Sequence, residues 1–286
     1  YLLLPHYMAR KKRNKIVEFI RLNNFATEGK ALGRKEGKVY FVENGVPGDL
    51  VDVFVLKNRT DYAKAKIHRI IEASPERIEP FCNHFEWCGG CKWQDMGYEH
   101  QLFYKQQEIE NNLKRIGHLE LPETTPILGS EKQYFYRNKM EFSFSDSRWM
   151  TLDEIQSDEE ITDRDALGFH IPGMWDKILD IKKCHLQQDP SNAIRLDTRD
   201  FAIKNGLTFF NPRHQHGELR SLMIRTASTG ELMVMIQFHD DNKVNRELIL
   251  NHLKETFPEI TSLLYVINQK QNDTIYDQEI ICFAGR

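Results

Sequence analysis

Three cysteines fall within the stretch PFCNHFEWCGGCKWQ, residues 80–94, with the spacing C-x5-C-x2-C: Cys82, Cys88 and Cys91. A C-x2-C pair lets two thiolates reach one centre, and Gly89 and Gly90 between them allow a tight turn around an ion or cluster. Cys184, 93 residues after the last of the three, is the natural fourth ligand. Four thiolates can hold tetrahedral zinc or a cubane iron–sulfur cluster, and the spacing does not choose between them.

Two features favour a cluster over zinc. One ligand is isolated far along the chain, whereas structural zinc sites more often use two short pairs. Aromatic residues surround the cysteines and would shield a cluster from water, although ordinary core packing would also place them there: Phe81, Phe85, Trp87 and Trp93. The fifth cysteine, Cys282, lies in an apolar run, which predicts a buried strand residue and no nucleophile.

The cysteine count also bears on the cellular compartment. Five cysteines at irregular spacing favour a reducing cytoplasm, where clustered thiols bind metal more often than they form disulfides. No stretch has the roughly 18 consecutive apolar residues that cross a bilayer, so we expect no membrane partner. Residues 1–7 are typical of a leader or cloning remnant, with Met8 as a plausible natural start.

Charge is distributed unevenly along the 286 residues, whose net charge is -3. Residues 1–72 contain 15 Lys and Arg against 8 Asp and Glu, and the remainder is acidic. A basic front end indicates that a polyanion binds mainly to the first domain. A solvated basic tail is the alternative, because RKKRNK at 10–15 supplies five of these positive residues. The acidic stretch 151–165 is typical of a mobile surface loop or insertion.

Short alternating apolar runs between residues 16 and 71 predict about five β-strands, which suffice for a small closed barrel of the OB type. In the last predicted strand, Ala63, Ala65 and Ile67 share one face because side chains alternate with period two. The other face is a candidate phosphate-contacting stripe with an aromatic at its edge, formed by Tyr62, Lys64, Lys66 and His68. Lysines that only keep an exposed face soluble would give the same pattern.

The rest of the chain predicts a mixed α+β domain with an antiparallel sheet. An amphipathic helix is expected over 98–116, and the later segments alternate between strand and helix patterns. Strands are expected at 136–145, 166–171 and 177–187, the last carrying Cys184, and in a hairpin of LRSLMIRT and ELMVMIQF. Helices are expected over 191–204 and 243–256, with a final hairpin around 269–273.

The order of these features resembles the S-adenosylmethionine-dependent RNA (uracil-5)-methyltransferases, especially those acting on 23S rRNA. A barrel of the TRAM type is followed by CNHFEWCGGCKWQ, the helix YEHQLFYKQQEIENNLKRIG, and then YRNKMEFSF, ALGFH and KKCHLQ. The resemblance covers about residue 14 to 286, and its most specific parts are the CGGC motif with the distant Cys184 and YRNKMEF.

This resemblance implies a 4Fe-4S cluster held by four residues: Cys82, Cys88, Cys91 and Cys184. It implies that the cluster supports folding and RNA binding, and that S-adenosylmethionine is the methyl donor. It also implies the following division: 1–13 as an N-terminal extension, 14–72 as the barrel, 73–97 as the cysteine knot, 98–120 as a helix against a catalytic domain, and 121–286 as the central domain.

Members of the family continue into a Rossmann-like domain with the S-adenosylmethionine site, the cysteine nucleophile and a general base. This sequence has no glycine-rich strand-to-helix turn and no Asp-Pro-Pro loop followed by a cysteine, so no catalytic residue is assigned and we expect the gene to continue past Arg286. We therefore expect the apolar stripe of the helix, which the absent domain would cover, to be less buried than its periodicity suggests: Leu102, Ile109, Leu113 and Ile116.

The candidate RNA-contacting residues lie in two places. Lys64, Lys66 and His68 belong to the barrel, and Arg137, Asn138 and Lys139 to the YRNK turn, where the two cations could instead guard a strand edge or pair with acidic neighbours. His170 and Lys177 are secondary candidates. We expect a cytoplasmic monomer that binds 23S rRNA. The alternatives are a tRNA (uracil-5)-methyltransferase and a non-catalytic RNA-binding adaptor with a cluster or zinc site.

Overall fold

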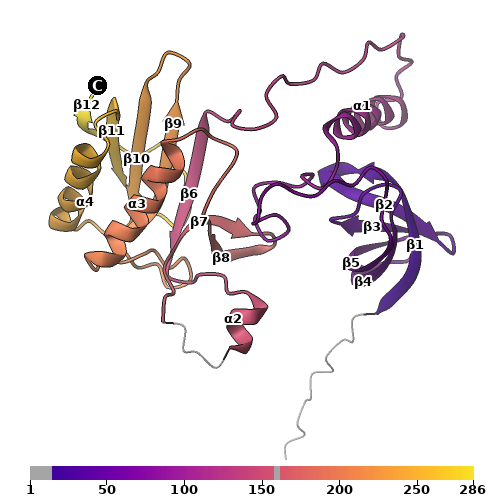
Figure 1. The fold of residues 1–286 in the computed structure, drawn as a ribbon, viewed down its shortest axis with the longest axis horizontal. Coiled ribbons are helices and arrows are strands. Elements are labelled where there is room, and N and C mark those ends of the chain that lie inside the picture. The colour runs from indigo at the N-terminus through magenta and orange to yellow at the C-terminus, as the bar shows by residue number, and fades with distance from the viewer. Residues whose placement is uncertain (1–14, 158–161) are drawn as a thin grey trace, which may run out of the picture. The chain divides into compact units, whose positions relative to one another are not determined.

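A computed structural model describes residues 15–157 and 162–286 of the chain. The expected N-terminal extension 1–13, the leader at 1–7 and Met8 lie outside the described residues, as does part of the acidic stretch. The described residues form two compact units (Figure 1): the barrel unit, 15–81 with 92–129, and the sheet unit, 82–91 with 130–286. None of the helices in these residues is long and apolar enough to cross a membrane.

The barrel unit contains the predicted five-stranded closed barrel, with strand order β1-β2-β3-β5-β4. Its elements are β1 (Ile16–Ala26), the short 3-10 turn Thr27–Gly29, β2 (Lys30–Lys35), β3 (Lys38–Glu43), β4 (Leu50–Asn58) and β5 (Tyr62–Glu72). Pairing of β1 with β4 closes the barrel, and β3 and β5 are its one parallel pair among the described strands. The predicted alternation along β5 is confirmed, because Ala63 and Ala65 are fully buried while Lys64 and Lys66 are exposed.

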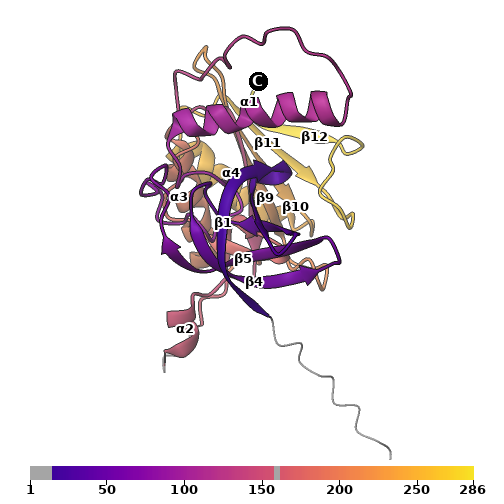
Figure 2. The same ribbon diagram turned by 90° about the vertical axis from the view of Figure 1, so that its right-hand side faces the viewer.

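The predicted helix is α1 (Tyr98–Arg115), which lies along the barrel in Figure 2. Its buried residue is Tyr104, whose ring meets the ring of Phe25 edge-on at 5.1 Å. The remaining apolar stripe is exposed as expected, since Ile109 is 57% and Ile116 75% accessible, with Leu113 also exposed. Leu102 is half-buried. One ring therefore anchors the helix, and most of its apolar stripe is unpacked in the described residues.

A buried ion-pair network fixes the chain where it leaves the barrel. The Arg77 guanidinium bonds to both carboxylate oxygens of Asp49, at 2.9 and 2.7 Å, and to Asp95 at 2.8 Å. Asp49 is completely buried and also accepts from the backbone N–H groups of Val46 and Ser74. Each buried charge thus has an opposite charge and further hydrogen bonds, the condition under which buried ions are tolerated.

The sheet unit is a seven-stranded sheet of order β12-β11-β10-β9-β6-β7-β8. Its strands are β6 (Lys139–Ser145), β7 (Ala166–Ile171), β8 (Met174–Asp180), β9 (Leu219–Thr226), β10 (Leu232–Phe238), β11 (Ser262–Ile267) and β12 (Ile280–Gly285). Its helices are α2 (Leu152–Gln156), α3 (Ser191–Lys204) and α4 (Lys243–Thr256). The expected helices over 191–204 and 243–256 and the hairpin of β9 and β10 are confirmed.

Helices α3 and α4 cover one face of this sheet (Figure 1). Met140, Phe142 and Phe144 alternate along β6 and join the same core as Ile194 of α3 and Leu250 of α4. The sheet is not wholly antiparallel as expected, because β10 and β11 pair in parallel. The crossover through α4 requires this, since a helix between two neighbouring strands returns the chain in the same direction.

Three local expectations are wrong. Cys184 lies in a loop after β8, because the strand ends at Asp180 and the next carbonyls accept hydrogen bonds from Arg195 instead of a strand. Cys282 is exposed, since β12 is an edge strand on which this residue points outward. The acidic stretch is not a plain loop, because it includes α2 and an ion pair from Glu154 to Arg148 at 2.9 Å.

Candidate metal-cluster site and nucleic-acid interface

The fold places all four predicted cysteine ligands in the sheet unit. Each is half-buried, and none forms a disulfide. Cys91 and Cys184 pack against the core of the sheet unit, although they are far apart in sequence. The Cys88 thiol is close enough to the other three to feel their charges.

The pKa of these thiols depends on their burial. Burial first, and then the charges of Cys91, Cys184 and Cys82, raise the pKa of Cys88 to about 12. Burial also raises the pKa of Cys184. At neutral pH without a bound cation these two thiols stay protonated. Thiolate ligands must be deprotonated, so metal binding here releases protons and strengthens as the pH rises.

The two glycines of the CGGC motif bring the backbone close to the sheet and to sulfur. Gly89 donates its N–H to the carbonyl of His170 at 3.1 Å, and a Cβ on Gly89 would lie 2.6 Å from that oxygen. Gly90 donates its N–H to the Cys88 sulfur at 3.4 Å. Backbone N–H groups directed at ligand sulfur are one of the levers by which a protein tunes a thiolate-bound cluster.

His84 links the cysteine loop to the segment that carries Cys184. Its Nε2 accepts the backbone N–H of Lys182 at 3.1 Å, and its Nδ1 lies 3.8 Å from the Cys82 sulfur. Burial lowers the pKa of His84, which favours the neutral ring. Because a backbone N–H can only donate, Nε2 is the acceptor and the ring proton sits on Nδ1, facing the sulfur. His84 therefore presents a donor to Cys82 while it holds the Cys184 segment.

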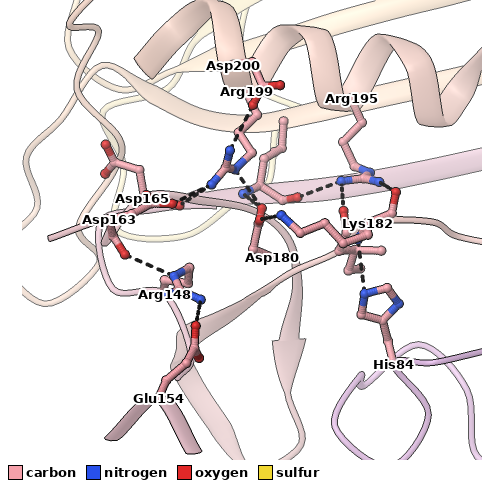
Figure 3. A network of polar contacts seen from close by, with 12 residues as sticks. His84, Arg148, Glu154, Asp163, Asp165, Asp180, Lys182, Arg195, Arg199 and Asp200 are labelled. Atoms are coloured by element: carbon pink, nitrogen blue, oxygen red, sulfur yellow. Dashed lines mark hydrogen bonds and ion pairs between the residues drawn. The ribbon is translucent and has the colours of Figure 1, made fainter. Parts of the chain in front are cut away.

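Arg195 of α3 holds the same segment from the other side (Figure 3). It is fully buried, and its guanidinium donates to the carbonyls of Ile181 and Lys182, the latter at 3.2 Å. Within the described residues it forms no ion pair with a carboxylate, and its Nε has no hydrogen-bond partner. Burial lowers its pKa to about 10, whereas the charges of Asp180 and Cys184 favour the cation.

Asn192, also on α3, fixes Cys184 itself. Its side-chain oxygen accepts the Cys184 N–H at 2.7 Å, and its amide donates to the Cys184 carbonyl at 3.0 Å. The guanidinium of Arg199 on the next turn is ion-paired to Asp180 at 2.9 Å, at the end of β8. Figure 3 shows this network joining α3 to the chain between Asp180 and Lys182. The position of the fourth cysteine is thus set by side chains of a rigid helix.

The donor set suits a soft metal, but no three His, Cys, Asp or Glu side chains among the described residues are arranged to hold a single metal ion. One zinc would require thiolates at about 2.3 Å from a common point, whereas a cluster spreads its ligands over several iron atoms. Thiols that sense one another's charge, an N–H donor to sulfur and glycines where the backbone approaches closely are features that a thiolate-bound metal ion or cluster would use.

The expected aromatic shell is only partly formed. Phe85 is buried, but Phe81 and Trp87 are 37% and 43% exposed. Trp93 belongs to the barrel unit, where its ring packs on Phe25 at 4.8 Å and its indole N–H donates to the Gly29 carbonyl. Proximity in sequence misled the prediction here, because the chain passes from one unit to the other between residues 91 and 92.

The outer face of the barrel combines lysines with aromatic rings. Lys64, Lys66 and His68 are all exposed, as predicted. The strand register places Lys64 beside Phe41 of β3 and Lys66 beside Phe54 of β4. The Phe54 ring also meets the His68 ring at 4.3 Å, and Phe41 meets Tyr62 at 5.9 Å. Sequence reasoning missed both phenylalanines, although the alternation in DLVDVFVL could have placed Phe54 outside.

This surface can contact a nucleic acid in two ways. Lysines contact phosphates without regard to sequence, and half-buried rings offer faces on which bases stack. Lys57 lies opposite Lys64 and adds a third cation, while Glu43 lies opposite Lys66. We call Phe41, Phe54, Tyr62, Lys64, Lys66 and His68 the barrel surface.

The YRNK segment of the sheet unit is exposed as well. Arg137, Asn138 and Lys139 all have accessible side chains, and their backbone is fixed because Arg137 donates to the Leu186 carbonyl and Asn138 accepts from Thr226. In the register of β6 and β9, Lys139 lies opposite Arg225, a third cation that sequence reasoning missed. Among the described residues Arg137, Lys139 and Arg225 form no ion pair, so pairing with acidic neighbours does not explain these cations.

The secondary candidates have different surroundings. His170 is exposed on β7, and its Nε2 lies 3.2 Å from the Ser143 hydroxyl oxygen. Lys177 is half-buried on β8. The structure thus gives His170 a polar partner on the sheet.

Comparison with known proteins finds relatives that are named RNA methyltransferases. No family model matches the chain. The chain is 49% identical over 264 residues to an uncharacterized RNA methyltransferase of Bacteroides thetaiotaomicron, and 47% identical over 272 residues to one of Porphyromonas gingivalis. These alignments cover 91% and 93% of this chain and 58% of each relative. The chain is a homologue of part of these RNA methyltransferases.

A solved structure shares the fold of this chain. It is the tRNA (uracil-54, C5)-methyltransferase of Pyrococcus abyssi in complex with S-adenosyl-L-homocysteine, with a TM-score of 0.60 and 23% identity. The match covers 94% of this chain and 55% of that one. The barrel followed by a sheet with helices therefore corresponds to about half of a uracil-5 methyltransferase structure, which confirms the predicted mixed fold.

Proposed function

We propose that this chain is the RNA-binding and iron–sulfur part of an RNA (uracil-5)-methyltransferase that acts on 23S rRNA in the cytoplasm. The observation that carries the proposal is the barrel surface, where exposed lysines alternate with aromatic rings on a chain whose relatives are named RNA methyltransferases. A barrel of this type with a lysine-lined outer face suits single-stranded RNA, because phosphate contacts and base stacking are available side by side.

The methyl transfer itself is assigned to the remainder of the whole protein. The chain spans 58% of the relatives it matches, and none of its described residues is assigned as a nucleophile. In the proposed reaction S-adenosylmethionine supplies the methyl group, and a cysteine thiolate adds to C6 of a uracil that has been taken out of its stack. The residues of this chain bind the RNA and hold it for that step.

The exposed stripe of α1 agrees with a further domain. Ile109, Leu113 and Ile116 face solvent along one side of the helix. Large apolar side chains gathered on one exposed face mark an interaction surface in soluble proteins. We assign this face to the catalytic domain of the whole enzyme.

We also propose that Cys82, Cys88, Cys91 and Cys184 hold a 4Fe-4S cluster. A bound cluster would supply a permanent crosslink between the cysteine loop and the segment after β8. His84 already joins these two segments through the Lys182 N–H, and Arg195 holds the segment after β8 against α3 through the neighbouring carbonyls. In this arrangement the cluster stabilises the sheet unit and carries no step of the methyl transfer.

RNA binding tests the main proposal. Fluorescence anisotropy of this chain with fragments of 23S rRNA, with tRNA transcripts and with duplex DNA should give the tightest binding to 23S rRNA, with an affinity that falls as salt rises. Tighter binding to tRNA would favour the tRNA-modifying alternative. Equal, weak binding to all three nucleic acids would contradict the proposal.

Methylation by the whole protein tests the reaction. The full-length protein with radiolabelled S-adenosylmethionine should label C5 of a uracil in 23S rRNA, which nuclease digestion and chromatography of the nucleosides would show. RNA binding without any methyl transfer by the full-length protein would favour the adaptor alternative.

A further inference from the structure

A cavity of about 320 Å³ opens in the sheet unit among β6, β7 and β8 and the loops near residues 212 and 271. None of the four clustered cysteines lines it. Its size lies at the lower end of the range for small-molecule sites, enough for a flat heterocycle and part of a sugar.

Phe144 lines the cavity, and part of the remaining lining lies on the face of the sheet that α3 and α4 leave open. Phe142 and Phe144 of β6 belong to the core beneath these helices, and side chains alternate along a strand. Ser143 therefore points to the opposite face, where its hydroxyl oxygen lies 3.2 Å from His170 Nε2. Both residues line the cavity.

The charged residues of the cavity neutralise one another. Asp176 bonds to Arg213 at 2.6 Å, and Asp273 bonds to Arg220 at 2.8 Å. Arg220 is buried and also donates to the Asn268 carbonyl at 2.8 Å. With these charges paired, the groups left for a ligand are neutral hydrogen-bonding groups and aromatic rings. The cavity therefore suits an uncharged polar heterocycle better than a phosphate group.

Trp175 supplies a stacking surface at this site. It lines the cavity, is 59% exposed, and has the Arg213 guanidinium over its ring at 5.2 Å. Exposure of a tryptophan costs free energy in a free protein, and a planar ligand would recover it. Gln215 and Gln271 also line the cavity and can read the edge of a base through their amides.

We propose that this cavity, which we call the base pocket, holds one unpaired nucleobase of the bound RNA. The base stacks on Trp175 and exchanges hydrogen bonds with Ser143 and His170. This inference rests on the proposed RNA-binding function and adds a second RNA-contacting site, in the sheet unit, to the barrel surface. Its role is to hold a base that neighbours the modified uracil in the RNA chain and so to contribute sequence preference.

The test compares two exposed aromatic residues of the sheet unit. Binding of a short single-stranded RNA from the preferred substrate is measured by fluorescence anisotropy with the full chain. Trp175→Ala should weaken binding roughly 5- to 100-fold, the range for the loss of one stacked base. Tyr276→Ala removes a 99% exposed ring that does not line the pocket and should leave the affinity unchanged.

Abasic RNAs identify the bound base. One abasic position should weaken binding to the wild-type chain and to the Tyr276→Ala variant but not to Trp175→Ala, because the variant has already lost the partner. Trp175→Phe keeps a stacking ring and should retain most of the affinity, which separates stacking from misfolding. If wild-type binds RNA while Trp175→Ala binds equally well, the base pocket is wrong and the proposed function stands. If wild-type binds no RNA, the proposed function itself fails.

Discussion

Two arginines, one half-buried and one fully buried, distinguish the two units of this chain. Arg77 of the barrel unit is surrounded by its own counter-charges, with bonds to Asp49 and Asp95 at 2.7 to 2.9 Å. Arg195 of the sheet unit is at least as deeply buried, yet its hydrogen bonds go to backbone carbonyls of Leu167, Ile181 and Lys182. The first charge is balanced by two carboxylates, and the second senses the charges of Asp180 and of the Cys184 thiol.

The difference bears on the cluster that we propose for the sheet unit. A buried cation is costly unless an anion or several hydrogen bonds compensate it. Protonated thiols cannot balance Arg195, but thiolates holding a metal cluster carry net negative charge and can. The barrel unit balances its arginine within the chain, and we infer that a bound cluster would add to the charge of Asp180 a second counter-charge for Arg195 of the sheet unit.

Removing a ligand should have the largest effect. We predict that Cys184→Ser abolishes cluster binding, so that iron and acid-labile sulfide fall to background in anaerobically purified protein. Cys282→Ser is the matched control, since this cysteine is exposed on β12 and outside the cluster site, and it should retain full iron. A Cys184→Ser protein with unchanged iron and sulfide content would contradict the four-ligand assignment.

Removing the balanced arginine should destabilise the barrel unit. Arg77→Met leaves the buried Asp49 carboxylate without its cation, so we expect the free energy of unfolding to drop by about 3–5 kcal/mol. Urea unfolding followed by fluorescence measures the change, and iron content should not alter. If Arg77→Met lost iron while the stability of the barrel unit stayed unchanged, the roles assigned to Arg77 and Arg195 would be contradicted.

Removing the unbalanced arginine should act on the cluster. We predict that Arg195→Met lowers cluster retention about 10- to 100-fold, as for outer-shell partners of metal sites, because both the counter-charge and the clamp on the Cys184 segment are lost. The decay of the cluster absorbance under a chelator measures retention. Arg195→Lys keeps the charge but loses the three carbonyl contacts, so its cluster retention should lie between those of the wild type and of Arg195→Met. Equal decay in all three proteins would contradict this role.

The lysines of the barrel surface should contribute through charge. Lys64→Gln and Lys66→Gln should each reduce the salt dependence of RNA binding, with the slope of log K against log salt falling by about 0.7 per lysine. Lys254→Gln on α4 is a charge-matched control outside the barrel surface and should leave the slope unchanged. If Lys64→Gln, Lys66→Gln and Lys254→Gln all lowered the slope of log K against log salt equally, RNA attraction would not be specific to the barrel surface and the prediction would be contradicted.

A single acidic residue of the sheet unit should give the smallest effect. Burial, and then Asp163 and Asp146, raise the pKa of Asp165 to about 6. The folded state thus holds this proton more tightly than the unfolded state, so the contribution of Asp165 is favourable at low pH and is lost as the pH rises through 6. Asp165→Asn should raise the unfolding free energy at pH 7 by on the order of 1 kcal/mol, with no gain at pH 4. Equal gains at both pH values would contradict this titration.

Much of the fold was predictable from local patterns. The helices over 191–204 and 243–256 and the alternation along β5 follow from periodicity, which burial on one face imposes on the sequence. The parallel pairing of β10 and β11 was not predicted, because it depends on the crossover through α4 and not on either strand. Burial of Cys282 was wrongly predicted for a related reason, since an apolar run does not show whether its strand lies at an edge.

Of the proposed site, only the four candidate ligands could be named from the sequence. Cysteine spacing indicates four thiols, yet the residues that hold them together are not visible in the pattern. In the sequence Arg195 cannot be told from an exposed cation on a helix, and only the structure shows that it is buried. The role of His84 likewise depends on the hydrogen bond from the Lys182 N–H, a residue far away in the sequence. Long-range contacts of this kind decide whether a polar residue is solvated or structural, and no local pattern encodes them.

Metal analysis of anaerobically purified protein tests the central claim most directly. Iron and acid-labile sulfide are measured together with zinc in the chain purified without air. The account predicts about four iron and four sulfide atoms per chain, with an absorbance that is lost in Cys184→Ser. Stoichiometric zinc without sulfide would contradict it.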